Sequence, residues 1–123
     1  MPVRVQTEDF DVSAEIKALR QGDARVGAVA VFVGTVRDRN DGATVSAMTL
    51  EHYPEMTQKA LQDIIEQAKG RWDIYDTLII HRVGPLQIED QIVLVAVTSA
   101  HRGEAFAACE FVMDYLKTNA PFW

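Results

Sequence analysis

Several cationic side chains stand at positions where folded chains commonly bind anions. His101 and Arg102 follow the apolar run QIVLVAVTSA and come directly before a segment that predicts a helix. The start of a helix offers unpaired N–H groups and a partial positive charge, and a guanidinium adds two parallel donors that suit phosphate or carboxylate. The pair therefore indicates an anion site, although a solvated arginine and a packed histidine would give the same pattern.

Arg37 and Arg39 lie where the apolar run GAVAVFVGTVR passes into the polar segment DRNDGAT. Binding groups are often placed at such strand ends, but a solvated hairpin end is the simpler interpretation.

Lys117 ends the last predicted helix, where a lysine complements the helix dipole. The apolar tail APFW after it is expected to cover the amine, and desolvation of a lysine makes it available as acid, base or nucleophile.

Other residue types give little support for metal or nucleophilic chemistry. His52 and His81 have no carboxylate or second histidine at ligand spacing, so no metal site is predicted. Cys109 lies on the apolar side of a predicted helix, where cysteine is commonly an inert small hydrophobe. The signatures of phosphate loops, dinucleotide sites, zinc proteases and serine hydrolases are all missing from the sequence.

Length and composition limit the class of protein. The 123 residues fit a single domain, and a net charge of −6 argues against nucleic acid as a partner. The longest apolar runs are far shorter than the roughly 20 residues of a membrane helix, and the N-terminus has no secretory signal. One cysteine allows no internal disulfide. We therefore expect one cytoplasmic domain over residues 1–123 that makes no membrane contact.

The elements that must position these residues follow from the spacing of apolar side chains. The expected strands are 3–7, 27–37, 45–53, 74–83 and 91–99, and the expected helices are 13–20, 54–69 and 103–117. Strands that arrive in adjacent pairs favour an α+β fold with a largely antiparallel sheet, in the order β-α-β-β-α-β-β-α. Strand 27–37 is expected to be buried on both faces for much of its length and to form a hairpin with 45–53.

Several local features of these elements are also predicted. Ser13 is the expected N-cap of the first helix, and Pro54 suits the first turn of the second. Gly34 interrupts its strand, which predicts a bulge or a close backbone approach. The buried side of the last helix is expected to contain Phe106, Cys109, Val112, Met113 and Leu116.

Four stretches together resemble the large, catalytic subunit of molybdopterin synthase, the MoaE family. They are GAVAVFVGTVRDRN, LEHYPEMTQKAL, IIHRVGPLQIEDQIVLVAVTSAHRGEAF and MDYLKTNAPFW, in the family's order and spacing from Gly27 to Trp123. The resemblance implies an α/β-hammerhead fold, which agrees with the paired strands. It also implies a sulfurtransferase of molybdenum cofactor biosynthesis, which converts cyclic pyranopterin monophosphate (precursor Z) to molybdopterin by inserting two dithiolene sulfurs.

The resemblance further implies protein partners and no bound cofactor. In the family, sulfur arrives as a thiocarboxylate on the C-terminal glycine of a ubiquitin-like small subunit of the MoaD type. The tail of that subunit threads into a pocket of the large subunit, and two of each form a heterotetramer around a large-subunit homodimer. The chain has no plausible sulfur donor of its own, which agrees with delivery from outside.

The family's site positions carry over onto this sequence. Lys117 matches the lysine of the LKTxAPFW stretch, which gives it the catalytic role as an acid, a base or a stabiliser of charge. The substrate-binding positions are the strand end Thr35, Val36 and Arg37 and the pair His101 and Arg102. Thr35 stands where many relatives have lysine, and Arg39 matches a variable position and is the weaker candidate. The resemblance implies that Arg37 and Arg102 clamp the phosphate beside Lys117.

Relatives continue past PFW with a further basic residue and a C-terminal segment, whereas the given sequence ends at Trp123. If the protein lacks this tail, the alternative is a catalytically impaired scaffold that still binds the ubiquitin-like small subunit. A sensor of a phosphorylated ligand would also explain the arginines, but it would not explain the partner-dependent pattern of the family.

Overall fold

The computed structural model describes residues 2–37, 39–40, 43–44, 47–50 and 54–119. In this part of the chain the helices are α1 (Val12–Arg20), α2 (Pro54–Arg71) and α3 (Arg102–Asn119). The strands are β1 (Val3–Gln6), β2 (Ala28–Thr35), β3 (Arg39–Asn40), β4 (Ala43–Thr44), β5 (Ala47–Leu50), β6 (Ile74–Arg82), β7 (Gly84–Gln87) and β8 (Gln91–Ser99). The three predicted helices are present, each close to its expected bounds.

A four-stranded sheet forms the centre of the fold, with the strand order β1-β6-β8-β2. β8 pairs antiparallel with both β2 and β6, whereas β1 pairs parallel with β6. The described sheet is therefore largely antiparallel, which confirms the predicted α+β class.

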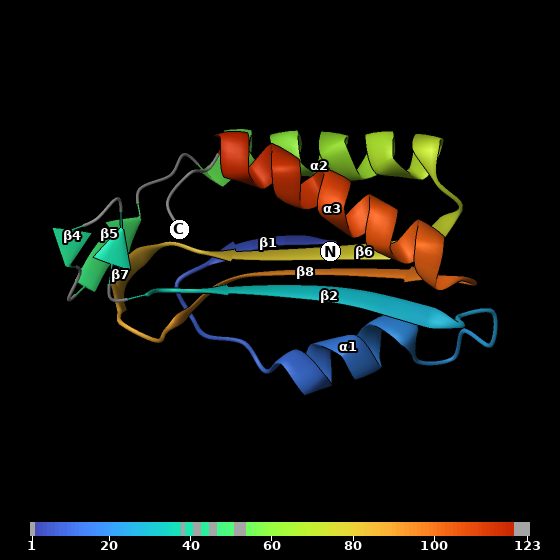
Figure 1. The fold of residues 1–123 in the computed structure, drawn as a ribbon, viewed down its shortest axis with the longest axis horizontal. Coiled ribbons are helices and arrows are strands. Elements are labelled where there is room, and N and C mark those ends of the chain that lie inside the picture. Colours follow the sequence, from blue (N-terminus) through green and yellow to red (C-terminus); the bar gives the residue numbers. More distant parts are fainter. Residues whose placement is uncertain (1, 38, 41–42, 45–46, 51–53, 120–123) are drawn as a thin grey trace.

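Helices cover the two faces of this sheet unequally (Figure 1). α2 and α3 lie on one face and form the main core with the strands beneath them, including Leu61, Ile65, Ile79, Val97 and Val112. α1 lies on the other face, over a smaller cluster around Phe10, Ile80 and Leu94, and none of its own residues is buried. β8 is buried along almost its whole length, because it is a central strand covered from both sides.

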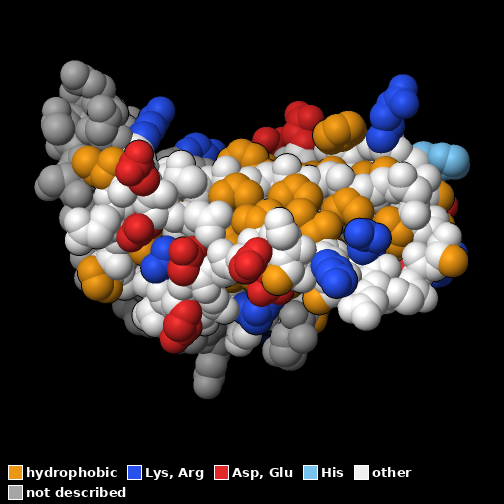
Figure 2. All heavy atoms as spheres, turned by 90° about the horizontal axis from the view of Figure 1, so that it is seen from below, with side chains coloured by type: hydrophobic (Ala, Val, Ile, Leu, Met, Phe, Trp, Pro, Cys, Tyr) orange, Lys and Arg blue, Asp and Glu red, His pale blue; other side chains and the backbone are white. Residues whose placement is uncertain are grey.

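The prediction that strand 27–37 is buried on both faces is wrong. β2 is an edge strand in which only Ala30 and Gly34 are buried, and Val31 is 38% exposed. An edge strand has one neighbour, and α1 leaves part of the face beneath it open, so an apolar run there is not fully covered. Figure 2, which views this face, shows hydrophobic side chains at the surface over the middle of the sheet.

The predicted hairpin between strands 27–37 and 45–53 is also wrong. β2 pairs with β8, while β5 pairs antiparallel with β7 in a separate small sheet at one end of the molecule (Figure 1). β7 falls in a segment expected to be a loop, and its first residue, Gly84, has a positive φ of 85°. Alternation of apolar and polar residues locates a strand but does not name its partner. Arg39 lies in β3, which pairs with β4, and its side chain falls outside the described part.

Two details of the helices differ from their predictions. The N-cap of α1 is Asp11 rather than Ser13, since the Asp11 carboxylate accepts a hydrogen bond from the Ala14 amide at 3.1 Å. On α3, Phe106 is 64% exposed instead of buried. The buried side of α3 contains Ala105, Ala108, Cys109, Val112 and Leu116. Small alanines therefore take the positions that let α3 approach the sheet closely, and the aromatic ring points outward. α2 begins at Pro54, as predicted.

Candidate functional site

The strand end that carries Arg37 lies at a bulge in the main sheet. The register of β2 against β8 shifts between Gly34 and Thr35, so Thr35 lies opposite Gln91, which confirms the irregularity expected at Gly34. Thr35 and Arg37 are exposed, on either side of the buried Val36. The bulge thus leaves two of the candidate substrate-binding side chains at the surface.

A turn at residues 87–90 holds the backbone immediately before Arg37. The Val36 amide donates to the Asp90 carbonyl at 2.9 Å, and the Glu89 amide donates to the Val36 carbonyl at 2.8 Å. Both hydrogen-bonding groups of Val36 are thereby used, and its side chain is 3% exposed. Arg37 consequently leaves a fixed backbone and extends into solvent.

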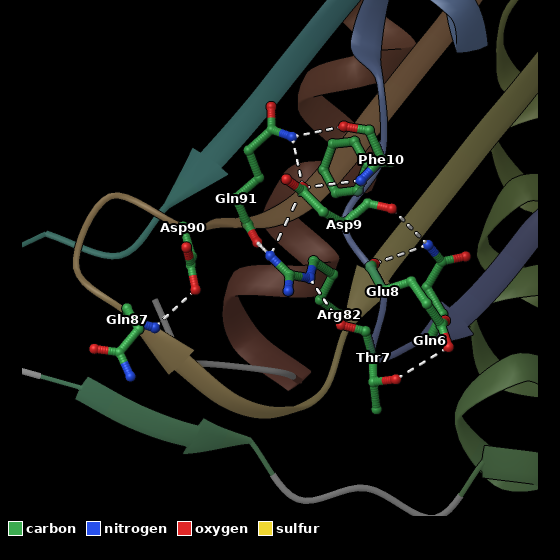
Figure 3. Close-up of polar contacts among 9 residues, drawn as sticks. All are labelled: Gln6, Thr7, Glu8, Asp9, Phe10, Arg82, Gln87, Asp90 and Gln91. Atoms are coloured by element: carbon green, nitrogen blue, oxygen red, sulfur yellow. Dashed lines mark hydrogen bonds and ion pairs between the residues drawn. The ribbon is translucent and has the colours of Figure 1, made fainter.

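A half-buried arginine, Arg82, ties the same end of the sheet to the loop after β1 (Figure 3). Arg82, whose side chain is 11% exposed, donates to the Thr7 carbonyl at 3.1 Å and to the Gln91 carbonyl at 3.0 Å. The Gln91 side chain donates to the Asp9 carboxylate at 2.8 Å and to the Phe10 carbonyl at 2.8 Å. The bond from Gln91, followed by one from the Phe10 amide, lowers the pKa of Asp9 below its ordinary value.

Lys117 lies in the last turn of α3, at the same end of the molecule as Arg37 (Figure 1). The helix starts beyond the end of β8 and runs back over the sheet, so its last turn comes above the end of β2. The Lys117 side chain is exposed, and residues 120–123, predicted to cover its amine, lie outside the described part. Two exposed cations at one end of the sheet favour an anion there.

His101 and Arg102 lie at the opposite end of the sheet, where α3 begins. Both side chains are exposed. The Ser99 hydroxyl donates to the Asp73 carbonyl at 2.8 Å, and the Glu104 carboxylate accepts from the Asp73 amide at 3.1 Å. The start of α3 is therefore fastened to the segment between α2 and β6, and the cationic pair stays at the surface.

The structure does not bring these two groups together within one chain. Lys117 comes 15 positions after Arg102 in the same helix, a distance of about 22 Å at 1.5 Å per residue. His101 follows β8, whose end lies beside the beginning of β2, whereas Arg37 lies beyond the other end of that strand. The eight residues of β2 span about 26 Å. In a single copy Arg37 and Lys117 share one end, and the predicted neighbours His101 and Arg102 are far from them.

One side of α3 connects the two groups, and the spacing of apolar residues in the sequence did not indicate it. The side that faces away from α2 carries four residues at helical spacing: Arg102, Phe106, Met113 and Lys117. Phe111 marks the opposite side, because it packs against Trp72 at the end of α2 with ring centroids 5.2 Å apart. α2 lies over β1 and β6 while α3 lies over β8 and β2, so this side of α3 is the one nearer the outer edge of β2. Phe106 is exposed there, and Met113 is partly buried against the core. The signal was the helical spacing of the buried residues Cys109, Val112 and Leu116. This spacing continues back to Ala105 rather than to Phe106, which leaves Phe106 on the exposed side.

Cys109 is not placed for sulfur chemistry. It is buried in the core, and burial raises the pKa of its thiol to about 11. The thiol therefore stays protonated at neutral pH, whereas the thiolate is the reactive form.

Among the described residues no group of three or more His, Cys, Asp or Glu side chains gathers to hold a metal ion, and none of the helices is long and apolar enough to cross a membrane. His52 lies outside the described part, and His81 is buried in β6.

In the part of the chain that it describes, the structure defines an α+β domain with a four-stranded sheet, two small two-stranded sheets and exposed cationic side chains at both ends of the main sheet. The family profile described as MoaE protein matches residues 5–119. A molybdopterin synthase catalytic subunit from Ralstonia nicotianae is 68% identical over 121 residues, which cover 98% of this chain and 69% of that protein. One from Vibrio cholerae is 57% identical, with coverages of 98% and 80%. The solved structure of a MoaE protein from Burkholderia ambifaria matches with a TM-score of 0.88 at 59% identity, covering 98% and 79% of the two chains. The chain belongs to the MoaE family.

Proposed function

We propose that this chain is a molybdopterin synthase catalytic subunit. The observation that carries the proposal is the match along nearly its whole length with relatives of that name. The reaction converts precursor Z into molybdopterin by inserting two sulfurs, and we place it in the cytoplasm. The sulfur comes from the thiocarboxylate of a MoaD-type small subunit, with no bound cofactor. The buried, protonated Cys109 supports delivery of sulfur from outside the chain.

The end of β2 is the proposed place of the reaction. The planar fork of Arg37 suits the cyclic phosphate of precursor Z, with Thr35 and Val36 beside it. Lys117, at the same end, transfers a proton or stabilises negative charge as sulfur attacks the pterin side chain. The exposure of Arg37 and Lys117 above one strand end supports these roles.

A homodimer of the chain accounts for cations at opposite ends of one copy. β2 is an edge strand of the described sheet, and strand edges pair readily with other strands. A second copy related by a two-fold axis across this edge would run antiparallel, so the two α3 helices would pass in opposite directions. Arg102 of one copy would then approach Lys117 of the other, and the exposed Phe106 would be covered. We propose that each site of the heterotetramer draws on both large subunits.

The role of Lys117 is tested with the complete complex of this chain, the thiocarboxylated small subunit and precursor Z. K117A is expected to lower product formation by about 10²–10⁴-fold, the usual contribution of a proton-transfer group, while folding and small-subunit binding remain. K117R, which keeps the charge, is the matched control. Wild-type turnover in K117A would exclude Lys117 from the mechanism. If the unsubstituted complex assembles without turnover, the chain is a scaffold instead.

Mixing two inactive variants tests whether a site draws on both copies. In a dimer of K117A with R102A, one site carries both substitutions and the other carries neither. Random mixing should therefore restore about a quarter of wild-type activity in a two-fold dimer. If both residues act within one copy, every site holds a substitution and the mixture stays as inactive as its parents.

A further inference from the structure

The turn between β7 and β8 is held in a conformation that its third residue does not favour. Glu89 has a φ of 75°, and it is the only non-glycine residue of the described part with a positive φ. The Asp90 amide donates to the Gln87 carbonyl at 3.1 Å, and the Asp90 carboxylate accepts from the Gln87 amide at 2.8 Å. Glu89 therefore occupies the third position of a β-turn, where a positive φ normally selects glycine or asparagine.

The side chain of Glu89 gives no reason for this conformation. It is exposed, and it makes no hydrogen bond or ion pair with another described residue. The backbone does give a reason, because the Glu89 amide donates to the Val36 carbonyl and the next residue's carbonyl accepts from the Val36 amide. Both bonds end on the residue that precedes Arg37. Strained backbone that persists in a folded protein is commonly found at functional sites.

The turn is anchored on its other side, so it can impose its position on Val36. Gln91, the residue after the turn, accepts a hydrogen bond from the half-buried Arg82 through its carbonyl and donates through its side chain to Asp9 (Figure 3). These bonds fix the turn to β6 and to the loop after β1, in addition to the pairing of Gln91 with Thr35 of β2. In the described sheet no strand lies on the outer side of β2, and the turn supplies both backbone hydrogen bonds of Val36, the residue before Arg37.

We propose that Glu89 is a positioning residue for Arg37. Its left-handed backbone fixes Val36 and thereby aims the Arg37 guanidinium at the phosphate of the substrate. The inference rests on the proposed function, in which Arg37 binds that phosphate. Its effect belongs to substrate binding and leaves the proton transfer assigned to Lys117 unchanged.

The test compares E89V with E89G in the complex with the thiocarboxylated small subunit. Valine is β-branched and resists a positive φ, whereas glycine adopts it freely. We expect E89V to raise the KM for precursor Z about tenfold, with kcat changed by less than about twofold. The reason is that Arg37 binds the phosphate equally well in the substrate complex and in the transition state, so its loss weakens binding without slowing the chemical step. E89G should keep both constants near those of the wild type. I64V, a core change on α2, lowers stability away from the turn and should leave KM unchanged.

A double-substitution cycle with R37A shows whether Glu89 acts through Arg37. If it does, E89V adds no further increase in KM to R37A. Increases that multiply, or an unchanged KM in E89V, would overturn the positioning role and leave the phosphate-binding role of Arg37 intact. An unchanged KM in R37A alone would instead refute that role, and the inference would fall with it.

Discussion

The two ends of the main sheet hold their cationic residues by different means. Where α3 begins, His101 and Arg102 follow β8 after Ala100, and the side chains of Ser99 and Glu104 fasten the helix start by hydrogen bonds with Asp73. At the other end, Arg37 is held by a turn that comes much later in the chain. At the first end the cationic pair lies at a local strand-to-helix junction, which long-range bonds to Asp73 then fasten. At the second end the backbone before Arg37 is held only by segments that meet in the folded protein.

This difference shows why a motif can locate one end and not the other. The pair at 101–102 lies between a strand and the start of a helix, and this local pattern is enough to place it at one end of the sheet. Arg37 becomes a defined position only when β8, its preceding turn and the loop after β1 have come together around Val36. Changes at the two ends should therefore act through different structural elements.

The largest effect is expected at Gly27, which closes the His101 end against Ala100. A Cβ added to Gly27 would lie 2.3 Å from the Ala100 carbonyl oxygen, so G27A forces two backbone segments apart. We expect the free energy of unfolding to fall by about 2–3 kcal/mol, measured by urea denaturation. The matched control is G70A in α2, where an added Cβ would meet nothing within 4 Å. Its free energy of unfolding should rise by roughly 0.5 kcal/mol, because alanine favours a helix more than glycine does. Equal stabilities of the two variants would show that the contact at Gly27 relaxes without cost.

A smaller effect is expected from R82M, which removes the arginine that anchors the Arg37 end. The Gln91 carbonyl loses a part-buried hydrogen bond, whereas water can replace the donor at the exposed Thr7 carbonyl. A loss of about 1 kcal/mol is therefore expected in the same denaturation experiment. R25M is the control at the other end. Arg25 pairs with Asp23 at 2.8 Å, but its side chain is 66% exposed, and little change is expected. A greater loss in R25M than in R82M would reverse the comparison.

The smallest effect is a pH dependence at Asp9. Its pKa is lowered by the hydrogen bonds from Gln91 and Phe10, so the folded state favours the carboxylate. The contribution is present above the ordinary pKa of 3.8 and is lost as the pH falls below it. Because the side chain is 66% exposed, D9N should cost only a few tenths of a kcal/mol at pH 7. Stability curves of wild type and D9N that converge below pH 3.8 would support this, and a constant gap would contradict it.

Most of the elements could be predicted because their periods are strong. The apolar face of α2 and the run in β8 both lie where their spacing indicates. Strand pairing could not be predicted in the same way, since the alternation in β5 fits a partner before it or after it equally well. The partner is β7, and its Gly-Pro start is typical of a loop.

The candidate site was predictable as a set of residues but not as an arrangement. Position and resemblance identified Arg37, His101, Arg102 and Lys117. Their separation was not predicted: Arg102 and Lys117 lie near opposite ends of α3 and therefore far apart in one copy. Glu89 gave no signal at all. Its importance lies in a backbone angle, and that angle depends on bonds to Val36 that no local pattern reveals.

α1 is joined to the rest of the molecule more weakly than α2 or α3. It packs through the half-buried Val12 and Leu19, and an ion pair between Arg4 and Glu15 links it to β1. Segments with so little buried apolar contact open far more often than the whole domain unfolds. The amide hydrogens of α1 should therefore exchange with solvent long before those of β8. In such an opening the helix leaves the sheet and uncovers the cluster around Leu94, while the strands that carry both cationic ends stay folded.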